Sequence, residues 1–263
     1  MLVHLLNFIR DANSLLVAAL AFGSIFGAAI LGFIVQRFIP GNHFSADSRD
    51  AAKLGAGLVA TLAALILGLL ISSTKGTFDR VNDQLNEVGA NYIHLDRLLA
   101  NYGPDTAPIR ADLRAALQTK LQTIWPEESA NSTAVPFTPQ SHFEHIAADI
   151  TSLHPANAYQ TQLKTGALQL ADNLLQEHWL IEVIGEGSVP PLLMVIPVIW
   201  VSFLTFLYAL FSPRNATVIA VLLVCSLSIA AAIFLIDEMA GPLDGYIKVP
   251  SAPLRFALDQ LGQ

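Results

Sequence analysis

Few residues in this 263-residue chain have the types and the spacing that chemistry requires. On a helix, the imidazoles of His142 and His145 could face one ion, but no second pair of ligands at a recognised spacing completes a metal site. The Ser, His and Asp side chains provide no nucleophile with both a base and an orienting group. The single cysteine, Cys225, lies in an apolar stretch, where thiol chemistry is not expected. The sequence therefore predicts no enzyme, no resident metal and no cofactor.

A second group of polar residues follows the last apolar stretch of the chain. Asp237, Glu238 and Asp244 offer the hard oxygen ligands that calcium prefers. The alternative is that these carboxylates simply solvate the end of a helix. We retain the three residues as candidate ion-binding residues.

Four long stretches of the chain contain no Asp, Glu, Lys or Arg, although charged residues make up 13% of the sequence. Each stretch exceeds the roughly 18–20 residues that a helix needs to cross a bilayer. They predict an all-α integral membrane protein with four transmembrane helices, which excludes a soluble enzyme, a nucleic-acid binder and a disordered chain. The four stretches are Ser14–Gln36, Leu54–Thr74, Val189–Ser212 and Ala216–Ile236.

The predicted spans contain no Asp, Glu, Lys, Arg or His side chain. Proton relays, coupled transporters and intramembrane hydrolases need such a group to hold a proton, an ion or a nucleophile inside the membrane. Their absence from the predicted spans disfavours active transport and intramembrane catalysis. A passive pathway remains, or a membrane anchor for a soluble domain.

The segment between the second and third spans, residues 75–188, is acidic and has the periodicity of helices. Its first apolar stripe continues from the second span, so we expect one long helix that leaves the bilayer and ends at Gly103-Pro104. Three more amphipathic helices are expected to complete a soluble bundle: one that opens with Pro108, one with apolar residues from Phe143 to Leu153, and one with apolar residues from Leu163 to Ile181. The first stripe comprises Phe78, Val81, Leu85, Val88, Tyr92, Leu95, Leu99 and Tyr102.

The predicted organisation has four parts. Residues 1–74 contain an interfacial helix at Met1–Ile9 and spans one and two, 75–188 form the acidic helical domain, 189–236 hold spans three and four, and 237–263 hold an acidic motif and a short amphipathic helix. That last helix has Ser251 as its candidate cap. An even number of spans places both termini and the acidic domain on one side of the membrane, and the distribution of Lys and Arg slightly favours the cytoplasm.

Small residues in the first two spans favour close packing between helices. The packing partner is either another span of the same chain or another subunit around a central axis. If the second span faces such an axis, its apolar side chains would form rings able to gate by excluding water. The candidate packing residues are Gly23, Gly27, Gly57, Ala64 and Gly68, and the candidate pore-lining residues are Leu58, Leu62, Leu65, Ile66 and Leu69.

Two segments carry a resemblance to the bacterial bestrophin-like domain family, which is named for its remote similarity to bestrophins. They are Leu95-Asp96-Arg97-Leu98-Leu99-x-x-Tyr102-Gly103 and Ile236-Asp237-Glu238-Met239-x-x-Pro242-Leu243-x-Gly245-Tyr246-Ile247-Lys248-Val249-Pro250-Ser251-x-Pro253-Leu254. The resemblance implies a pentameric anion channel whose second helix lines the pore and whose central segment is cytoplasmic. It also places the acidic stretch after the fourth span where bestrophins have their calcium clasp.

Two features depart from the bestrophin pattern. The second span, Leu54–Thr74, contains no aromatic residue, whereas the bestrophin neck carries aromatic rings. The acidic domain carries the whole net charge of −7, which would repel anions unless its inner wall is locally basic. A cation-selective or weakly selective pore therefore remains open.

The sequence thus predicts an oligomeric, passive ion channel of the inner (plasma) membrane. Its partners would be small inorganic ions, membrane lipid and further copies of itself, without nucleic acid. The alternative is a non-conducting, membrane-anchored interaction or sensory protein that uses its acidic helical domain to bind a partner.

Overall fold

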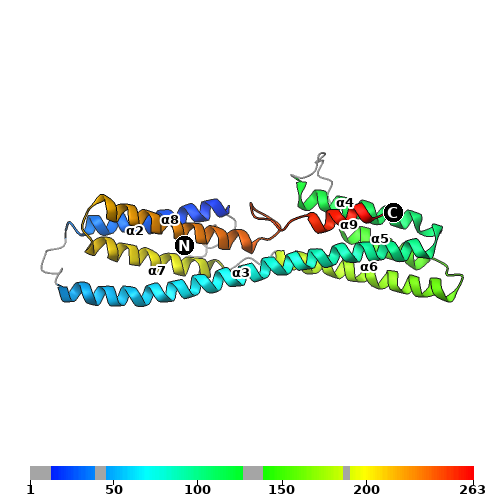
Figure 1. Cartoon of the computed structure of the whole chain (residues 1–263), viewed down its shortest axis with the longest axis horizontal. Coiled ribbons are helices and arrows are strands. Elements are labelled where there is room, and N and C mark those ends of the chain that lie inside the picture. Colours follow the sequence, from blue (N-terminus) through cyan, green and yellow to red (C-terminus); the bar gives the residue numbers. More distant parts are fainter. Residues whose placement is uncertain (1–12, 39–45, 127–138, 186–189) are drawn as a thin grey trace. The chain divides into compact units, whose positions relative to one another are not determined.

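The computed structural model describes residues 13–38, 46–126, 139–185 and 190–263, with only the backbone described for 46–49, 139–143, 181–185 and 191. These residues form helices and no strands, which confirms the all-α class (Figure 1). The predicted interfacial helix at Met1–Ile9 lies outside the described residues. The helices are α2 (Ser14–Val35), α3 (Ala46–Tyr102), the 3₁₀ helix η2 (Pro104–Thr106), α4 (Ala107–Ile124), α5 (Pro139–Ser152), α6 (Ala158–Gly185), α7 (Pro191–Phe211), α8 (Ala216–Ala240) and α9 (Ala252–Gln260).

The chain divides into two compact units. One, called here the membrane unit, comprises Met1–Phe78 and Gly187–Lys248. The other, the bundle unit, comprises Asp79–Glu186 and Val249–Gln263. Helix α3 contributes residues to both units, and each unit is built from two separate pieces of the chain.

Within the described residues, four helices are long and apolar enough to cross a membrane, as the sequence predicts. Their ends differ from the charge-free stretches. Helix α3 begins at Ala46 rather than Leu54, because an alanine-rich segment with an Asp50–Lys53 ion pair of 3.3 Å favours helix outside the apolar core. Helix α8 continues past Ile236 to Ala240, so Asp237 and Glu238 lie in its last turn.

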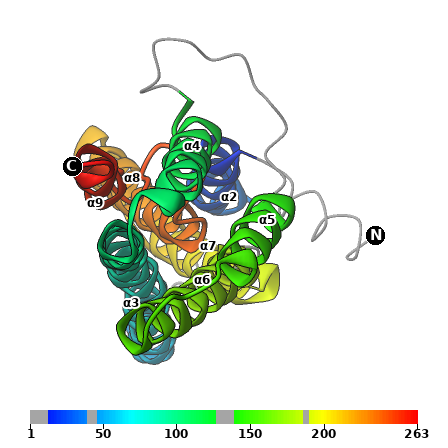
Figure 2. The same ribbon diagram turned by 90° about the vertical axis from the view of Figure 1, so that its right-hand side faces the viewer.

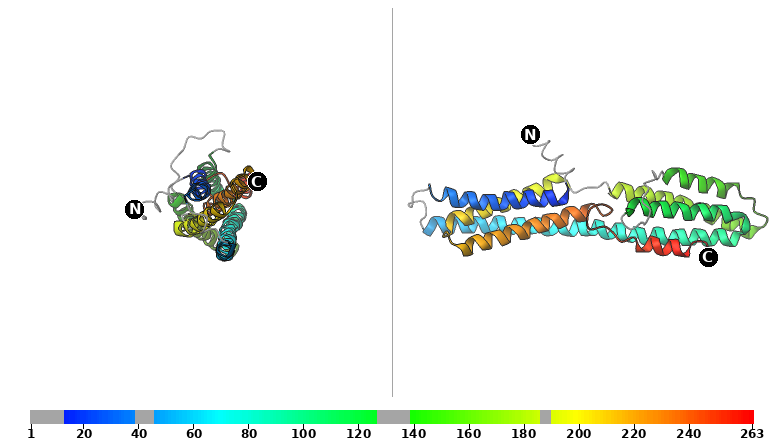
Figure 3. Two further views of the ribbon diagram at one scale, coloured as in Figure 1. Left: turned by 90° about the vertical axis from the view of Figure 1, so that its left-hand side faces the viewer. Right: turned by 90° about the horizontal axis from the view of Figure 1, so that it is seen from above.

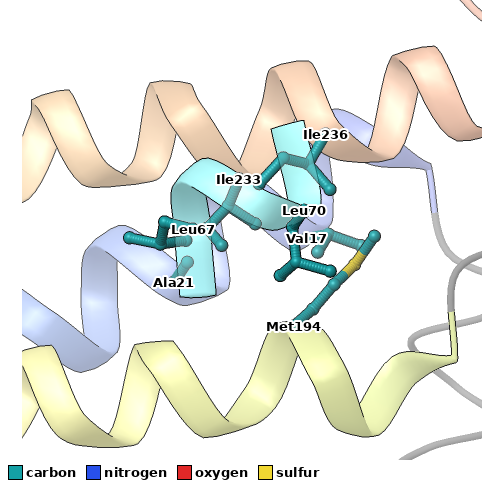
Figure 4. Close-up of a cluster of buried hydrophobic side chains, with 7 residues drawn as sticks. All are labelled: Val17, Ala21, Leu67, Leu70, Met194, Ile233 and Ile236. Atoms are coloured by element: carbon teal, nitrogen blue, oxygen red, sulfur yellow. The ribbon is translucent and has the colours of Figure 1, made fainter. Parts of the chain in front are cut away.

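The four spans share a core in the membrane unit. Each helix contributes to a cluster of buried side chains in which Leu67 and Leu70 of α3 meet residues of α2, α7 and α8 (Figure 4). Burial of this apolar surface fixes which face of each span points inward. The cluster comprises Val17, Ala21, Leu67, Leu70, Met194, Ile233 and Ile236.

Helices α2 and α7 approach each other closely at Gly32. A Cβ atom added to Gly32 would lie 2.5 Å from the main-chain oxygen of Phe206 and 2.9 Å from the Cβ of Ala209. The hydroxyl of Thr205 donates a hydrogen bond of 3.0 Å to the main-chain oxygen of Ile25 and joins the same pair of helices. Glycine is therefore required here because the neighbouring backbone occupies the space of a side chain.

We expect Gly32→Ala to destabilise the membrane unit by about 1–3 kcal/mol, the usual cost of overpacking. Thermal unfolding of the purified protein in detergent measures the effect. Gly27→Ala is the matched control, because a Cβ at Gly27 would meet nothing within 4 Å and alanine favours helix. Equal melting temperatures for the two variants would contradict a tight α2–α7 contact.

In the bundle unit, helices α3, α4, α5 and α6 enclose a buried interior, and Figure 2 shows these helices end on. The predicted stripe of α3 is buried from Val81 to Tyr102, and Phe78 is half-buried. The helix ends where the sequence predicts, since Gly103 has a φ of 135°, which side-chain-bearing residues rarely adopt. The helical character of the described residues between the second and third spans is thereby confirmed.

Helix α9 packs on the bundle, along α3 and α4 (Figure 3). A Cβ added to Gly89 of α3 would lie 3.0 Å from the main-chain oxygen of Pro253. The indole of the buried Trp125 donates a hydrogen bond of 3.0 Å to the main-chain oxygen of Val249. Ser251 occupies the N-cap position of α9, as predicted, but its side chain makes no capping hydrogen bond; its hydroxyl accepts a hydrogen bond of 3.0 Å from Arg255 Nε instead.

An ion pair in the bundle unit holds the residues that follow α9. Asp96 is 1% exposed and accepts two hydrogen bonds from Arg110, of 2.7 Å from Nε and 2.9 Å from Nη2. Its Oδ2 also accepts from the main-chain N–H of Gly262 at 3.3 Å. Arg114 donates to the main-chain oxygens of Leu258 and Leu261, which otherwise lack partners at the end of a helix. Helices α3 and α4 thus fix the C-terminal end of α9.

Glu177 of α6 is a half-buried carboxylate beside α3. Asn91 Nδ2 donates a hydrogen bond of 2.7 Å to its Oε1, while its Oε2 is buried without a hydrogen-bond partner among the described residues. Burial, and next the negative charge of Glu87, raise the pKa of Glu177; the Asn91 hydrogen bond and the charge of Lys120 oppose these effects. The ionised form of Glu177 is therefore disfavoured in the folded state.

The free energy of unfolding should consequently fall as the pH rises from about 4.3, the pKa of an unfolded glutamate, through the higher pKa of folded Glu177. We expect Glu177→Gln to raise the melting temperature at neutral pH and to leave it unchanged in acid. Thermal unfolding measured across this pH range tests the prediction. Asp172→Asn, which changes an exposed carboxylate of the same helix, should show no such growing difference.

Candidate functional site

The most extensive exposed apolar feature of α3 is a row of leucines along its membrane-spanning part. The residues recur every three or four positions, so they lie on one face of the helix. Four of the five candidate pore residues belong to this row. We call it the leucine stripe; its members are Leu54 (75% exposed), Leu58 (71%), Leu62 (50%), Leu65 (68%) and Leu69 (69%).

The fifth candidate, Ile66, does not belong to the leucine stripe. It is half-buried and packs against the core cluster of the membrane unit. The buried face of α3 carries Ala56, Ala63, Leu67 and Leu70 instead. Helix α3 therefore uses one face for its own unit and leaves the leucine stripe uncovered by the described part of the chain.

The small residues of α3 lie beside the leucine stripe and are exposed as well. A Cβ added to Gly57 or Gly68 would meet nothing within 4 Å, and Ala64 between them is exposed. Gly23 and Gly27 of α2 are open in the same way. None of the five candidate packing residues therefore forms a close intramolecular contact in the described part of the chain.

Among the described glycines of the four spans, Gly32 makes a close contact within the chain, to α7. It follows Ala28 at the same four-residue spacing that singled out Gly23 and Gly27, so the spacing alone could not rank them. The glycines that remain open offer a surface on which another helix could approach closely.

Cationic residues bound the apolar part of α3. Lys53 pairs with Asp50 at its start, and the ammonium group of Lys75 lies 6.0 Å from the centre of the Phe78 ring at its end. No charged residue occurs between them, from Leu54 to Thr74. An ion that moved along this face would meet an apolar barrier with charges at each end.

The acidic residues after the fourth span organise a turn. Glu238 is 2% exposed, and its Oε2 accepts hydrogen bonds from the main-chain N–H groups of Tyr246 at 2.6 Å and Ile247 at 2.9 Å. Gly245 has a φ of 80°, and a Cβ there would lie 2.7 Å from Glu238 Oε2. The carboxylate thus holds the turn, and glycine is required beside it.

The other two candidate ion ligands do not join Glu238. Asp237 hydrogen-bonds to Ser14 at the start of α2, and Asp244 is exposed. In the described part of the chain, no group of three or more His, Cys, Asp or Glu residues is placed to hold a metal ion. The structural role of Glu238 in the turn is clear from its bonds, whereas ion binding stays a prediction.

The profile of the Bestrophin-like domain matches residues 23–254, most of the chain. The chain belongs to the bestrophin-like domain family. The two segments that carry the resemblance both contain buried carboxylates with structural bonds, Asp96 with Arg110 and Glu238 with the turn. No curated protein sequence matches this bestrophin-like domain.

Solved structures share the fold of this bestrophin-like domain. A bacterial bestrophin homologue from Klebsiella pneumoniae, solved by zinc anomalous phasing, is 16% identical with a TM-score of 0.64, covering 93% of this chain and 98% of that chain. A tyrosine-to-alanine variant of that homologue gives the same values. The structure of a membrane protein with a proline-to-alanine change is 17% identical with a TM-score of 0.64, covering 94% of this chain and 99% of that chain.

Proposed function

We propose that this bestrophin-like domain assembles with further copies of itself around an axis into a passive ion channel, with α3 facing the pathway. The observation that carries the proposal is the leucine stripe with its neighbouring small residues, which the described part of the chain leaves uncovered. Membership of the bestrophin-like family supports the same function, because bestrophins are anion channels. By that analogy the assembly is a pentamer and the permeant ions are small inorganic anions.

The proposed mechanism is permeation through rings of leucine side chains. Narrow apolar rings exclude water, and an ion that enters them loses its hydration shell. A rotation of α3 that moved the small residues Gly57, Ala64 and Gly68 toward the axis would widen the pathway. The pathway is passive because the charge-free stretch of α3 offers no side chain to hold a proton or a coupling ion.

The proposed location is the inner (plasma) membrane, which the chain crosses several times. The bundle unit and both termini would lie on one side, since an even number of spans returns the chain to its starting side, and the distribution of Lys and Arg favours the cytoplasm for that side. Asp237, Glu238 and Asp244 remain candidates for ion binding in this assembly.

Reconstitution of the purified protein into liposomes tests the function. We expect ion flux, with a reversal potential that follows the permeant ion when chloride or sodium is replaced by a larger ion. The mass of the detergent-solubilised protein should correspond to a ring of identical subunits. A monomer that conducts no ion in any salt would overturn the proposal and favour the non-conducting, membrane-anchored interaction or sensory protein.

A further inference from the structure

The membrane unit contains a groove between α2 and α8 that the proposed channel function does not use. It has a volume of about 370 Å³, within the ~300–1,000 Å³ of typical ligand pockets. Its apolar lining comes from both helices, and two arginines join it. The groove is lined by Phe26, Ile30 and Phe33 of α2, Ile219 of α8, and Arg37 and Arg214.

The two arginines belong to one end of the groove by their positions in the chain. Arg37 follows the end of α2 at Val35, and Arg214 lies in the connection between α7 and α8. Both lie directly beyond apolar spans, where a membrane protein meets the headgroup region. The groove therefore combines a cationic end with an apolar remainder.

Hydrogen bonds hold the guanidinium of Arg214 in place. Its Nε donates to Gln36 Oε1 at 2.8 Å, and Gln36 Nε2 donates to the main-chain oxygen of Ser212 at 3.0 Å. Within the described residues, neither Arg37 nor Arg214 forms an ion pair with a carboxylate. The positive charge at the groove is thus positioned but not neutralised by the described part of the chain.

We propose that this groove binds an anionic phospholipid, with the phosphate on Arg37 and Arg214 and one acyl chain along the apolar lining. Guanidinium groups bind phosphate oxygens through charge-assisted, often bidentate hydrogen bonds. A zwitterionic headgroup would bring its own cation close to the two arginines and is disfavoured. Helix α3 contributes no lining residue, so the lipid site is separate from the proposed ion pathway.

Native mass spectrometry of the full-length protein tests the site with phosphatidylglycerol and phosphatidylcholine of identical acyl chains. We expect phosphatidylglycerol to bind more tightly, and the double variant Arg37→Gln/Arg214→Gln to lose about tenfold or more of that affinity. Lys53→Gln is the charge control. It removes a positive charge at the start of the apolar part of α3, and Lys53 does not line the groove. Equal binding of the two lipids, or an equal loss in the control, would overturn the proposal.

A second pair of variants tests the apolar half of the site. Ile30→Trp places a large ring in the groove, whereas Leu31→Trp makes the same change at an exposed residue of α2 that does not line it. Only Ile30→Trp should weaken phosphatidylglycerol binding. In a last experiment, inorganic phosphate and glycerol phosphate compete with bound phosphatidylglycerol. If either displaces the lipid at a concentration similar to that of the lipid, the site binds a free anion and the proposed acyl-chain contact is refuted. Size-exclusion chromatography first checks that each variant elutes as the wild type does and is therefore folded.

Discussion

Serine at Leu62 or Leu65 is expected to raise the ion leak of the reconstituted protein. Both leucines lie on the exposed leucine stripe, so neither substitution opens a cavity in the core of the membrane unit. A hydroxyl group in an apolar ring favours the entry of water, and this lowers the free-energy barrier to an ion that crosses the ring. A barrier lowered by about 1.4 kcal/mol would raise the rate of permeation about tenfold. Ion flux from liposomes at equal protein density measures the effect.

Leu227→Ser is the control for this prediction. Leu227 is 56% exposed on α8, so the substitution makes the same chemical change on an exposed face of another span. Its leak should equal that of the wild type. If Leu62→Ser and Leu65→Ser conduct like the wild type in a protein that is otherwise active, the pathway does not run along α3.

Alanine at Arg110 is expected to reduce the free energy of unfolding of the bundle unit by about 3 kcal/mol. The substitution leaves the carboxylate of Asp96 buried without its cationic partner, and breaking a buried ion pair in this way is strongly destabilising. It also removes the Nη2 contact of 3.3 Å to the main-chain oxygen of Gln263. Denaturant unfolding in detergent, followed by tryptophan fluorescence in a protein that keeps the buried Trp125 and has Trp179 and Trp200 replaced by Phe, measures the loss.

Arg97→Ala separates the ion pair from the rest of this contact. Arg97 is exposed and donates to the same oxygen of Gln263 at 3.0 Å, but it has no bond to Asp96 among the described residues. It should change the free energy of unfolding by less than about 1 kcal/mol, as exposed charged contacts usually do. Equal losses for the two variants would mean that Asp96 is stable without its partner.

Local patterns in the sequence were sufficient to predict the helices. The four spans follow from the absence of charge over long stretches, and the stripe from Val81 to Tyr102 follows from a helical period sustained over many turns. The end of α3 follows from Gly103. The errors occur where local signals compete: the apolar stretch ends at Ile236, but helix-forming residues carry α8 to Ala240.

Contacts between distant residues could not be predicted in the same way. Nothing near Asp96 in the sequence indicates that Arg110 is its partner, because the pairing depends on how α4 folds back on α3. The lipid groove likewise depends on Arg37 and Arg214, which only the packing of α2 and α8 brings together. Glycine spacing predicted close packing but did not distinguish Gly32, which packs within the chain, from the open Gly27.

The division of the bundle unit into two pieces has a consequence for biosynthesis. Its second piece, Val249–Gln263, follows all four spans in the sequence, while its first piece, Asp79–Glu186, precedes the third. During translation the first piece is therefore made before α9, and the contacts of Gly89 with Pro253 and of Asp96 with Gly262 form only after the third and fourth spans have been made. In a chain that ends before its later spans, Asp96 would lack the contact to Gly262 and α4 would lack the contacts of α9, so completion of the bundle depends on synthesis of the membrane part.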